Sequence, residues 1–369
     1  MNLMKKISLD DKKIVNLYEN LPNRAKESFY IDIVSSEIQN TNNIEGVKSS
    51  REDIVNTTKK VVTNNINDDL KFLSIVKSYT AIKDIDENSL NYNLKSNKIN
   101  GFDKFNKNIK DIYDIRKIYD KITADGVDEE NLPDGEVFRK GSVYIQGKNG
   151  TLHSGVSDNE NSEPIIKNLL SKLIDFMNEE ECTLVKNAIF HYYFGYIHPF
   201  YDGNGRTARF ISSLILKEDY SWLTACSLSQ GVNKKRSLYL KAFEYTNNLS
   251  MQGEMNFFID SFLSLINIGQ CEILENLNNK TILLEEAYKI INSDKRVICD
   301  DKIYKIVDVA IQIYLFGNND YLEVKDIENL IDCKNTTART YANKLCEMNI
   351  MKKISQKPMR LVINSDYIG

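Results

Sequence analysis

The sequence predicts a mainly helical protein with one short β-hairpin near its middle and a small mixed module at its C-terminal end. Only 5 prolines and 16 glycines interrupt 369 residues. Apolar residues recur at intervals of three and four along most of the chain, which is the period of an amphipathic helix. The length suggests two or three compact units. We expect an N-terminal helical region at 1–115, a core at 116–270 and a C-terminal domain at 271–369.

The first half of the chain contains the predicted hairpin. In the N-terminal region, one helix is expected to end at Gly46, because glycine is a common residue just past a helix end. Polar helices are expected at about 50–64 and 68–84. Residues 126–156 hold much of the glycine, and 143–145 alternate as a strand does. This pattern predicts a hairpin whose tip lies at 147–150.

Helical patterns return at 163–265. The segment 184–200 is apolar on nearly every face, so its helix should be buried; it stops at Pro199. Farther along, three helical patterns at 303–316, 324–333 and 335–349 precede a strand-like stretch at 350–364. Three helices followed by a hairpin are the order of a winged helix-turn-helix domain.

Composition excludes several classes of protein. A net charge of -4 and a pI of about 5.7 give no general attraction to nucleic acid or anionic lipid. Six cysteines without a CxxC pair, and only three histidines, argue against structural zinc and for reduced thiols. The N-terminal residues do not resemble a secretory signal, and no uninterrupted apolar run is long enough to span a bilayer. We therefore expect a cytoplasmic protein without a membrane partner.

The segment from His198 to Arg209, HPFYDGNGRTAR, carries the candidate chemistry. Gly203 and Gly205 lie between a buried helix and the start of the next one. Such a turn lets backbone N–H groups point inward and form an anion nest at a helix N-terminus, where phosphate is favoured. Arg206 and Arg209 are three residues apart, so both guanidinium groups can emerge on one side of the second helix.

Two further side chains of this segment complete a candidate catalytic site for a polyphosphate substrate. Asp202 supplies an oxygen ligand for Mg²⁺, which usually accompanies phosphates held by one or two carboxylates. His198 ends the preceding helix, and a neutral imidazole there could take a proton from an incoming hydroxyl. A plain helical corner would account for a lone GNG. It does not account for His, Asp, Asn, two Gly and two Arg within twelve residues.

This segment resembles the Fic family signature, HPF-x-[DE]-GNGR-x-x-R, at every defined position. The resemblance covers about residues 115–265. It implies an all-helical core with a β-hairpin flap beside the site, which residues 138–156 resemble, and a homodimer. It also implies transfer of AMP from ATP to a Ser, Thr or Tyr hydroxyl of a target protein, and to the chain itself. The related Doc-type kinases lack the second Gly-Arg arrangement and transfer the γ-phosphoryl group instead.

The resemblance also implies a role for each residue of the signature. His198 would deprotonate the target hydroxyl, and Phe200 would anchor the loop in the core. Asp202 would hold Mg²⁺ between the α- and β-phosphates of ATP. The phosphates themselves would be bound by Gly203, Asn204, Gly205, Arg206 at the β-phosphate and Arg209 at the γ-phosphate. The flap would align the target by strand addition, which uses backbone hydrogen bonds.

A second, shorter motif lies at Thr41 to Gly46. Thr41 and Glu45 are four residues apart and share one helical face. Taken alone, the pattern is an ordinary helix end. Beside the Fic signature it resembles the family's inhibitory motif, [ST]-x-x-x-E-[GN]. The resemblance implies that Glu45 pairs with Arg209 and blocks productive binding of the γ-phosphate. It places the chain in the class whose inhibitory motif precedes the core.

Other residues have weaker signals. We expect His153 to be a solvated loop residue, His191 to be packed and hydrogen-bonded, and Trp222 to lie in the core. Asn233, Arg236 and Tyr239 fall where Fic proteins close over adenine and ribose. An amphipathic helix against the core explains them equally well.

The tail gathers positive charge. Between residues 336 and 360, one glutamate, Glu347, opposes six basic residues: Arg339, Lys344, Lys352, Lys353, Lys357 and Arg360. A basic recognition helix and wing permit DNA contact, although this fold also serves protein contacts.

Three alternative interpretations remain open. A Fic fold could use another nucleotide donor such as UTP, or could remove AMP. In a different class, the chain could be a DNA-binding regulator that uses ATP binding as a signal, which a salt-dependent shift of duplex DNA would support.

Overall fold

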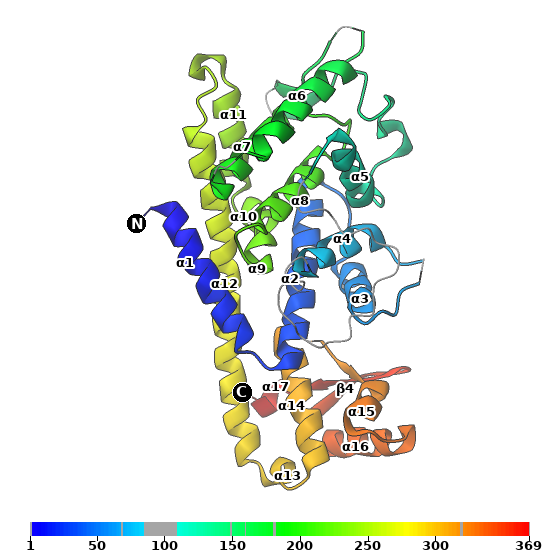
Figure 1. Cartoon of the computed structure of the whole chain (residues 1–369). Coiled ribbons are helices and arrows are strands. Elements are labelled where there is room, and N and C mark those ends of the chain that lie inside the picture. The colour runs from blue at the N-terminus through cyan, green and yellow to red at the C-terminus, as the bar shows by residue number, and fades with distance from the viewer. Residues whose placement is uncertain are drawn as a thin grey trace. The chain divides into compact units, whose positions relative to one another are not determined.

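The computed structural model describes residues 2–67, 69–84, 109–147, 150–158, 160–179, 182–317 and 320–368. Residues 85–108 of the predicted N-terminal region, and 148–149 at the predicted hairpin tip, lie outside the described residues. The described chain is mainly helical with two small antiparallel sheets (Figure 1), which confirms the predicted mainly helical fold with a β-hairpin. It forms two compact units, residues 1–13 with 33–273 and residues 14–32 with 274–369.

These units differ in two respects from the three regions expected from the sequence. A junction lies at 273/274, near the expected 270/271, but none falls at 115/116. The reason is packing, because the helices at 51–62 and 73–84 contact each other and the second of them contacts the core helices. Residues 14–32 group with the C-terminal part of the chain: the ring of Phe29 packs edge-on against Phe316 at 6.2 Å, and the Ala25 N–H donates to Gln312 Oε1 at 3.1 Å.

The first unit contains most of the helices. Three of them, α1 (Leu3–Glu19), α2 (Asn23–Glu45) and α12 (Asn256–Ser293), also contribute residues to the second unit. The remaining elements are α3 (Arg51–Val62), α4 (Leu73–Asp84), α5 (Ile112–Thr123), η1 (Glu129–Asn131), β1 (Tyr144–Gly147), β2 (Gly150–Ser154), α6 (Glu163–Met177), α7 (Thr183–Ile197), α8 (Asn204–Leu216), α9 (Trp222–Ala225), α10 (Leu228–Lys234), α11 (Arg236–Asn247) and η2 (Leu249–Met251).

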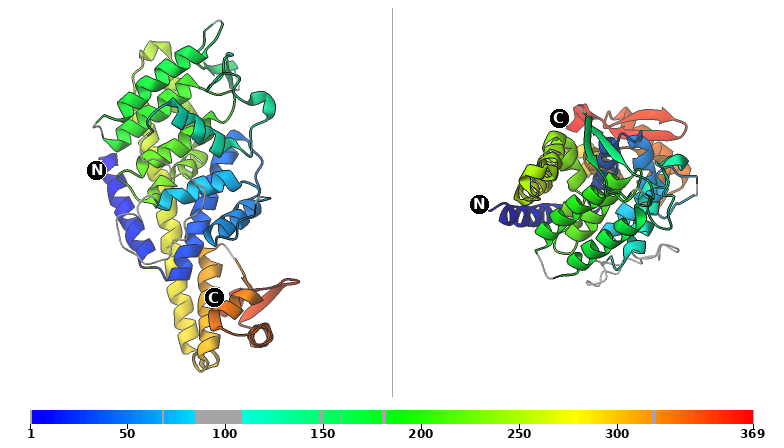
Figure 2. Two further views of the ribbon diagram at one scale, coloured as in Figure 1. Left: turned by 45° about the vertical axis from the view of Figure 1, so that its right-hand side comes forward. Right: turned by 90° about the horizontal axis from the view of Figure 1, so that it is seen from above.

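Helices α7 and α8 form the centre of this unit. Helix α8 contacts α7, α5, α4 and α9, and α6 packs on α7 (Figure 2). The described part of α8 is buried at every position except Gly205. Phe190 and Phe194 of α7 are at most 1% exposed, as the apolar pattern of this segment predicted. The turn between α7 and α8 is therefore fixed by the packing of both helices.

Helix α2 ends where the sequence predicted. Its last residue is Glu45, and Gly46 adopts a left-handed conformation with φ of 75°. The N–H of Val47 then donates to the carbonyl of Asn42 at 3.0 Å. Glycine carries no Cβ and adopts this conformation without strain. The cap places Glu45 in the last turn of the helix.

The predicted hairpin is present in the first unit. Strands β1 and β2 pair antiparallel, with Tyr144 opposite Ser154 and Gly147 opposite Gly150, which confirms a hairpin within residues 138–156. An irregularity between Ile145 and Gln146 shifts the register.

The second unit has its own core. Its C-terminal elements are α13 (Lys295–Ile298), α14 (Asp301–Phe316), β3 (Leu322–Glu323), α15 (Val324–Ile331), α16 (Asn335–Glu347), β4 (Met351–Gln356), β5 (Met359–Ile363) and α17 (Ser365–Ile368). The strands form one antiparallel sheet in the order β3-β5-β4. Helix α14 contacts β5 and α15, and α16 contacts α15 and β4.

Helix α12 has an unusual composition. Within the described residues, it alone has the length and hydropathy of a membrane-spanning helix, with a mean hydropathy of 1.3 over 18 residues. However, 56% of that window is buried inside the protein, and Phe258 and Phe262 are each 1% exposed. A core helix of a soluble protein meets the same criteria, so this feature alone does not indicate a membrane.

Adjacent aromatic residues of α7 provide a test of this packing. Phe194 is fully buried, whereas Tyr193 is 42% exposed. Phe194→Ala should lower the free energy of unfolding by about 3–5 kcal/mol, since it removes a large core side chain and leaves a cavity. Tyr193→Ala should change it by less than about 1 kcal/mol. Urea unfolding of the full chain measures both, and equal losses for the two variants would contradict the assignment.

Candidate active site

The motif loop between α7 and α8 is fixed by its own residues. His198 ends α7 in a left-handed conformation with φ of 52°, and Gly203 begins α8 with φ of 81°. The side chain of Asn204 bonds to both backbone groups of Phe200: its Nδ2 donates to the carbonyl at 2.8 Å, and its Oδ1 accepts from the N–H at 3.0 Å. These two bonds close the loop from within.

Phe200 holds this loop in the core, as predicted. Its ring is fully buried and stacks on Tyr119 of α5 at 3.7 Å, while Phe138 packs on it edge-on at 5.5 Å. The aromatic cluster joins α5, the segment before the hairpin and the motif loop. These contacts thus fix the motif loop against α5 and the segment before the hairpin.

His198 is presented as a neutral imidazole. Burial is the main cause that lowers its pKa, to about 4, and the positive charge of Arg139 adds to this. Its Nδ1 lies 3.3 Å from the carbonyl of Gly195. A carbonyl can only accept, so Nδ1 carries the proton in this hydrogen bond and Nε2 keeps its lone pair. That arrangement suits a general base at neutral pH.

Arg206 lies beside the start of α8 and is almost completely buried. One terminal nitrogen donates to the carbonyl of Gly126 at 2.8 Å and lies 3.5 Å from Asp202 Oδ2. Within the described structure its Nε has no hydrogen-bond partner. Burial lowers the pKa of this guanidinium, although Asp202 acts in the opposite direction. A buried guanidinium that lacks a hydrogen-bond partner can bind an anion, because the anion supplies both the missing hydrogen bond and an opposite charge.

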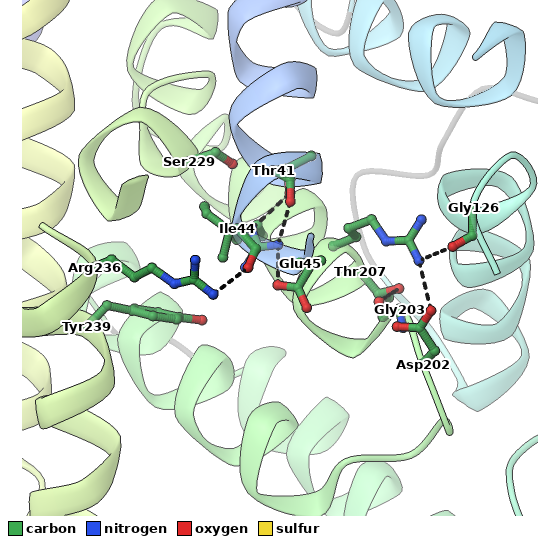
Figure 3. Close-up of polar contacts among 12 residues, drawn as sticks. Thr41, Ile44, Glu45, Gly126, Asp202, Gly203, Thr207, Ser229, Arg236 and Tyr239 are labelled. Atoms are coloured by element: carbon green, nitrogen blue, oxygen red, sulfur yellow. Dashed lines mark hydrogen bonds and ion pairs between the residues drawn. The ribbon is translucent and has the colours of Figure 1, made fainter. Parts of the chain in front are cut away.

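Arg209 is fully buried and holds the predicted partners from α2. These partners, Thr41 and Glu45, are labelled in Figure 3. Its Nε donates to Thr41 Oγ1 at 2.8 Å, and Nη2 donates to Glu45 Oε1 at 2.7 Å and to the Thr41 carbonyl at 3.2 Å. Burial lowers the pKa of Arg209, but the Glu45 carboxylate more than offsets this, so the net pKa is raised. Its Nη1 has no partner among the described residues.

Gly205 separates the two arginines and contacts the same carboxylate. A Cβ at this position would overlap Glu45 Oε1 and crowd Arg209 Nη1. A side chain at this position would therefore require the Glu45 carboxylate to shift. The structure thus brings together the residues that the sequence singled out at 198–209 and 41–46.

Asp202 is the candidate metal ligand. One carboxylate oxygen accepts the N–H of Gly203 at 2.5 Å, and the side chain is 41% exposed. Within the described residues, no three His, Cys, Asp or Glu side chains lie close enough to hold a metal ion alone. This donor set fits Mg²⁺ that is shared with substrate phosphates, because Mg²⁺ commonly takes one or two carboxylates and completes its shell with phosphate and water.

Arg139 is a key residue that sequence analysis missed. It is fully buried, and its three nitrogens donate to backbone carbonyls: Nε to His198 at 2.7 Å, Nη1 to Gly141 at 2.5 Å, and Nη2 to Val156 at 2.8 Å and Ile197 at 3.3 Å. One guanidinium therefore joins both ends of the flap to the motif loop and the end of α7. No local pattern marks such a residue, because its partners are backbone atoms far along the chain.

The segment before the flap is held by two carboxylates. Glu163, at the start of α6, accepts the backbone N–H groups of residues 136, 137 and 138 at 2.6–3.0 Å. Tyr201, the variable residue of the motif, donates to Asp134 at 2.9 Å and accepts the N–H of Gly141 at 2.8 Å. The base of the flap is thus fixed directly to the motif.

The other two histidines have different roles from His198. His191 is fully buried, with Nδ1 2.9 Å from Ser212 Oγ and Nε2 2.8 Å from the Tyr239 hydroxyl, which confirms a packed, hydrogen-bonded residue. His153 is not the solvated loop residue that the sequence suggested. It lies in β2, is only partly exposed, and its Nε2 is 2.8 Å from the Tyr196 carbonyl. Trp222 is 8% exposed, as expected of a core residue.

The sequence left three residues undecided between a contact to adenine or ribose and a helix packed on the core, and in the structure they contact other parts of the site. Arg236 donates to the carbonyl of Ile44 in the last turn of α2 at 2.9 Å (Figure 3), and Asn233 donates to Asn40 at 2.9 Å. Tyr239 is buried and bonds to His191. Segment 233–239 therefore holds the helix that carries Glu45.

Comparison with known proteins finds a protein family whose model matches part of the chain. Residues 110–216 match the model of the Fic/DOC family, a range that spans α5, the flap, α6, α7 and α8. This stretch of the chain is therefore similar to a Fic/DOC family domain. Proteins of this family generally are enzymes that transfer nucleoside monophosphates to proteins.

Solved structures include similar chains, and the first of them, with a TM-score above 0.5, shares the fold. A Fic family protein from Desulfovibrio desulfuricans is similar over 99% of this chain and 97% of its own, with 17% identity and a TM-score of 0.51. A Fic domain-containing signaling protein from Bacteroides thetaiotaomicron covers 74% of this chain and 94% of its own, with 16% identity and a TM-score of 0.49. Fic-1 from C. elegans covers 76% of this chain and 73% of its own, with 17% identity and a TM-score of 0.45.

The state of His198 can be measured directly. With its pKa lowered to about 4, the imidazole should stay neutral from pH 8 down to about pH 5. Histidine side-chain NMR of the full chain, with the resonance assigned by comparison with His198→Gln, measures the titration. A midpoint at or above the ordinary value for histidine would contradict the neutral base.

Proposed function

We propose that this chain is a protein adenylyltransferase that transfers AMP from ATP to a serine, threonine or tyrosine hydroxyl of a target protein, and to itself. The observation that carries the proposal is the pair Arg206 and Arg209. Both are buried beside the N-terminus of α8, and each has a guanidinium nitrogen with no partner among the described residues. A polyphosphate satisfies such groups with charge-assisted hydrogen bonds.

In the proposed reaction, His198 removes a proton and the phosphate-binding residues neutralise charge. Nε2 of His198 takes the proton of the target hydroxyl, whose oxygen then attacks the α-phosphorus of ATP. The bond from that phosphorus to its bridging oxygen breaks, and pyrophosphate leaves. Arg206 and Arg209, with the N–H groups at the start of α8, neutralise the phosphates. Asp202 would hold Mg²⁺, which supplies further charge neutralisation when bound with ATP.

The flap is the proposed docking element for the target. Its base is fixed to the catalytic loop through Arg139 and Tyr201. A target segment added as a strand to this hairpin would therefore be placed at a constant distance from His198. Backbone pairing tolerates varied target sequences, which is why the acceptor is proposed only as a hydroxyl side chain.

Glu45 and Thr41 are proposed to inhibit the chain's own transfer reaction; we call this pair the brake. The Glu45 carboxylate binds the same guanidinium that the γ-phosphate would need, and Thr41 bonds to its Nε. A carboxylate and a phosphate cannot both occupy one donor edge of Arg209. The productive pose of ATP therefore requires that Glu45 moves away, which implies slow transfer by the unmodified chain.

A second candidate function concerns the C-terminal elements. We propose that α14–α16 and the β4–β5 hairpin form a winged helix that contacts DNA. The observation in favour is a groove of about 340 Å³ lined by Lys325, Arg339 and Lys357. Against it, three of the other basic residues face carboxylates: Lys344 with Asp300, Lys352 with Asp366 and Arg360 with Glu323. The adenylyltransferase is the better supported proposal.

Intact mass after incubation with ATP and Mg²⁺ tests donor, base and brake together. The wild type should gain the mass of AMP slowly and Glu45→Gly faster, by about tenfold or more, because one charge-assisted competitor is removed. Glu45→Gly/His198→Ala should gain none, since the base is lost.

The control for this experiment is UTP in place of ATP, which separates donors. Gain from UTP alone would support another nucleotide donor, and loss of AMP from a modified protein would support the reverse reaction. No transfer by any variant, despite measurable ATP binding, would contradict the proposal and favour an ATP-responsive DNA-binding regulator.

A further inference from the structure

Glu37 is a second carboxylate on the helix that carries the brake. It lies four residues before Thr41 and eight before Glu45, so all three share one face of α2. The residue is 1% exposed, and its Oε1 accepts the backbone N–H of Ser229 at 3.1 Å and the Ser229 hydroxyl at 2.5 Å. Its Oε2 is buried with no hydrogen-bond partner among the described residues. Burial of such a group is costly, so the hydrogen bonds to Ser229 must compensate for it.

Two further contacts continue the same line. Asn233 donates to Asn40 at 2.9 Å, and Arg236 donates to the Ile44 carbonyl at 2.9 Å. That carbonyl belongs to the last turn of α2, where no intrahelical N–H is available, and a cation is favourable at this end of a helix. The three contacts join positions 37, 40 and 44 of α2 to positions 229, 233 and 236. We call this set the α2 clamp.

The α2 clamp is separate from the ion pair that it supports. The Glu45 side chain is a quarter exposed and lies in the final turn, where helices fray. A partly exposed ion pair contributes little by itself to holding a helix. In contrast, Ser229 is fully buried and its bonds to Glu37 are shielded from water. The buried end of the clamp therefore has the larger effect on where α2 lies.

We propose that Glu37 is a positioning residue: its hydrogen bonds to Ser229 fix α2 on α10, so that Glu45 stays on Arg209. The inference rests on the proposed function where it is tested by the rate of self-modification. It does not rest on it where it is tested by amide hydrogen exchange of α2. Loosening the contact between Glu37 and Ser229 releases Glu45 without altering any group that binds the substrate.

Ser229→Ala tests the proposal in the full chain. The control is Ser227→Ala, since Ser227 is equally buried but its hydroxyl donates to Thr224 within its own turn at 2.8 Å. Self-modification by ATP should rise about 3- to 10-fold in Ser229→Ala, as expected for loss of one hydrogen bond to a carboxylate. It should not rise in Ser227→Ala, nor when Ser229→Ala is added to Glu45→Gly.

The outcomes separate this inference from the proposed function. An unchanged rate in Ser229→Ala, or an equal rise in the Glu45→Gly background, would overturn it. If Glu45→Gly transfers no nucleotide at all, the proposed function fails. The positioning role of Glu37 is then tested by amide hydrogen exchange alone. Faster exchange at residues 41–45 in Ser229→Ala than in Ser227→Ala supports the positioning role, and equal exchange overturns it.

A pH profile provides a second readout. Burial raises the pKa of Glu37 from an ordinary 4.5 to about 7, against the lowering effects of Ser229 and of Arg209 on α8. The other titratable groups facing it are Tyr79 of α4 and Cys226, whose own pKa values are raised by burial. Because the docked helix binds the proton more tightly, the stability of docking is greatest below pH 4.5 and is lost as pH rises through 7.

The rate of the wild type relative to Glu45→Gly should therefore rise between pH 6 and 8. This ratio cancels the effects of pH on ATP, Mg²⁺ and His198. In Glu37→Gln, which cannot ionise but keeps an oxygen for Ser229, the ratio should stay constant. A constant ratio in the wild type, or a parallel rise in Glu37→Gln, would contradict the role of the Glu37 carboxylate.

Discussion

The arrangement of the site depends on one buried cation, Arg209. A guanidinium removed from water must be neutralised and hydrogen-bonded, or it destabilises the fold. Here the partners come from α2, through Thr41 and Glu45. In the proposed reaction they come from the γ-phosphate of ATP. The same requirement therefore stabilises the resting structure and creates the affinity for substrate, and the two anions exclude each other because both need the same donors.

Other contacts fix the motif loop and the flap, so that the proposed exchange of Glu45 for the γ-phosphate on Arg209 stays local. Asn204 and Phe200 fix the loop from within, and Arg139 ties the flap to the carbonyls at the end of α7. Neither set includes Glu45 or Arg209, so the proposed departure of Glu45 breaks none of these contacts. The part that can move is the end of α2, which is held by the clamp and by a cap at Gly46. In the proposed regulation, the residues of the motif loop stay in place while Glu45 moves.

Local sequence pattern predicted the helices, the hairpin at 138–156 and the residues of both motifs, because each depends on neighbours within a few positions. It could not predict Arg139, whose partners lie up to 59 positions away, or Glu37, which meets Ser229 across 192 positions. The pattern also left Arg236 undecided between a nucleotide contact and a packed helix. In the fold it bonds to the end of α2, a contact that depends on how α11 approaches α2.

The most direct test of the shared-cation account is the affinity for ATP compared with ADP, measured by calorimetry with Mg²⁺ for the wild type and Glu45→Ala. If Glu45 occupies the γ-phosphate position on Arg209, the wild type should bind the two nucleotides nearly equally. Glu45→Ala should then prefer ATP by about tenfold or more, since one charge-assisted hydrogen bond is gained. A wild type that already prefers ATP to the same extent as Glu45→Ala would show that the carboxylate and the γ-phosphate do not compete.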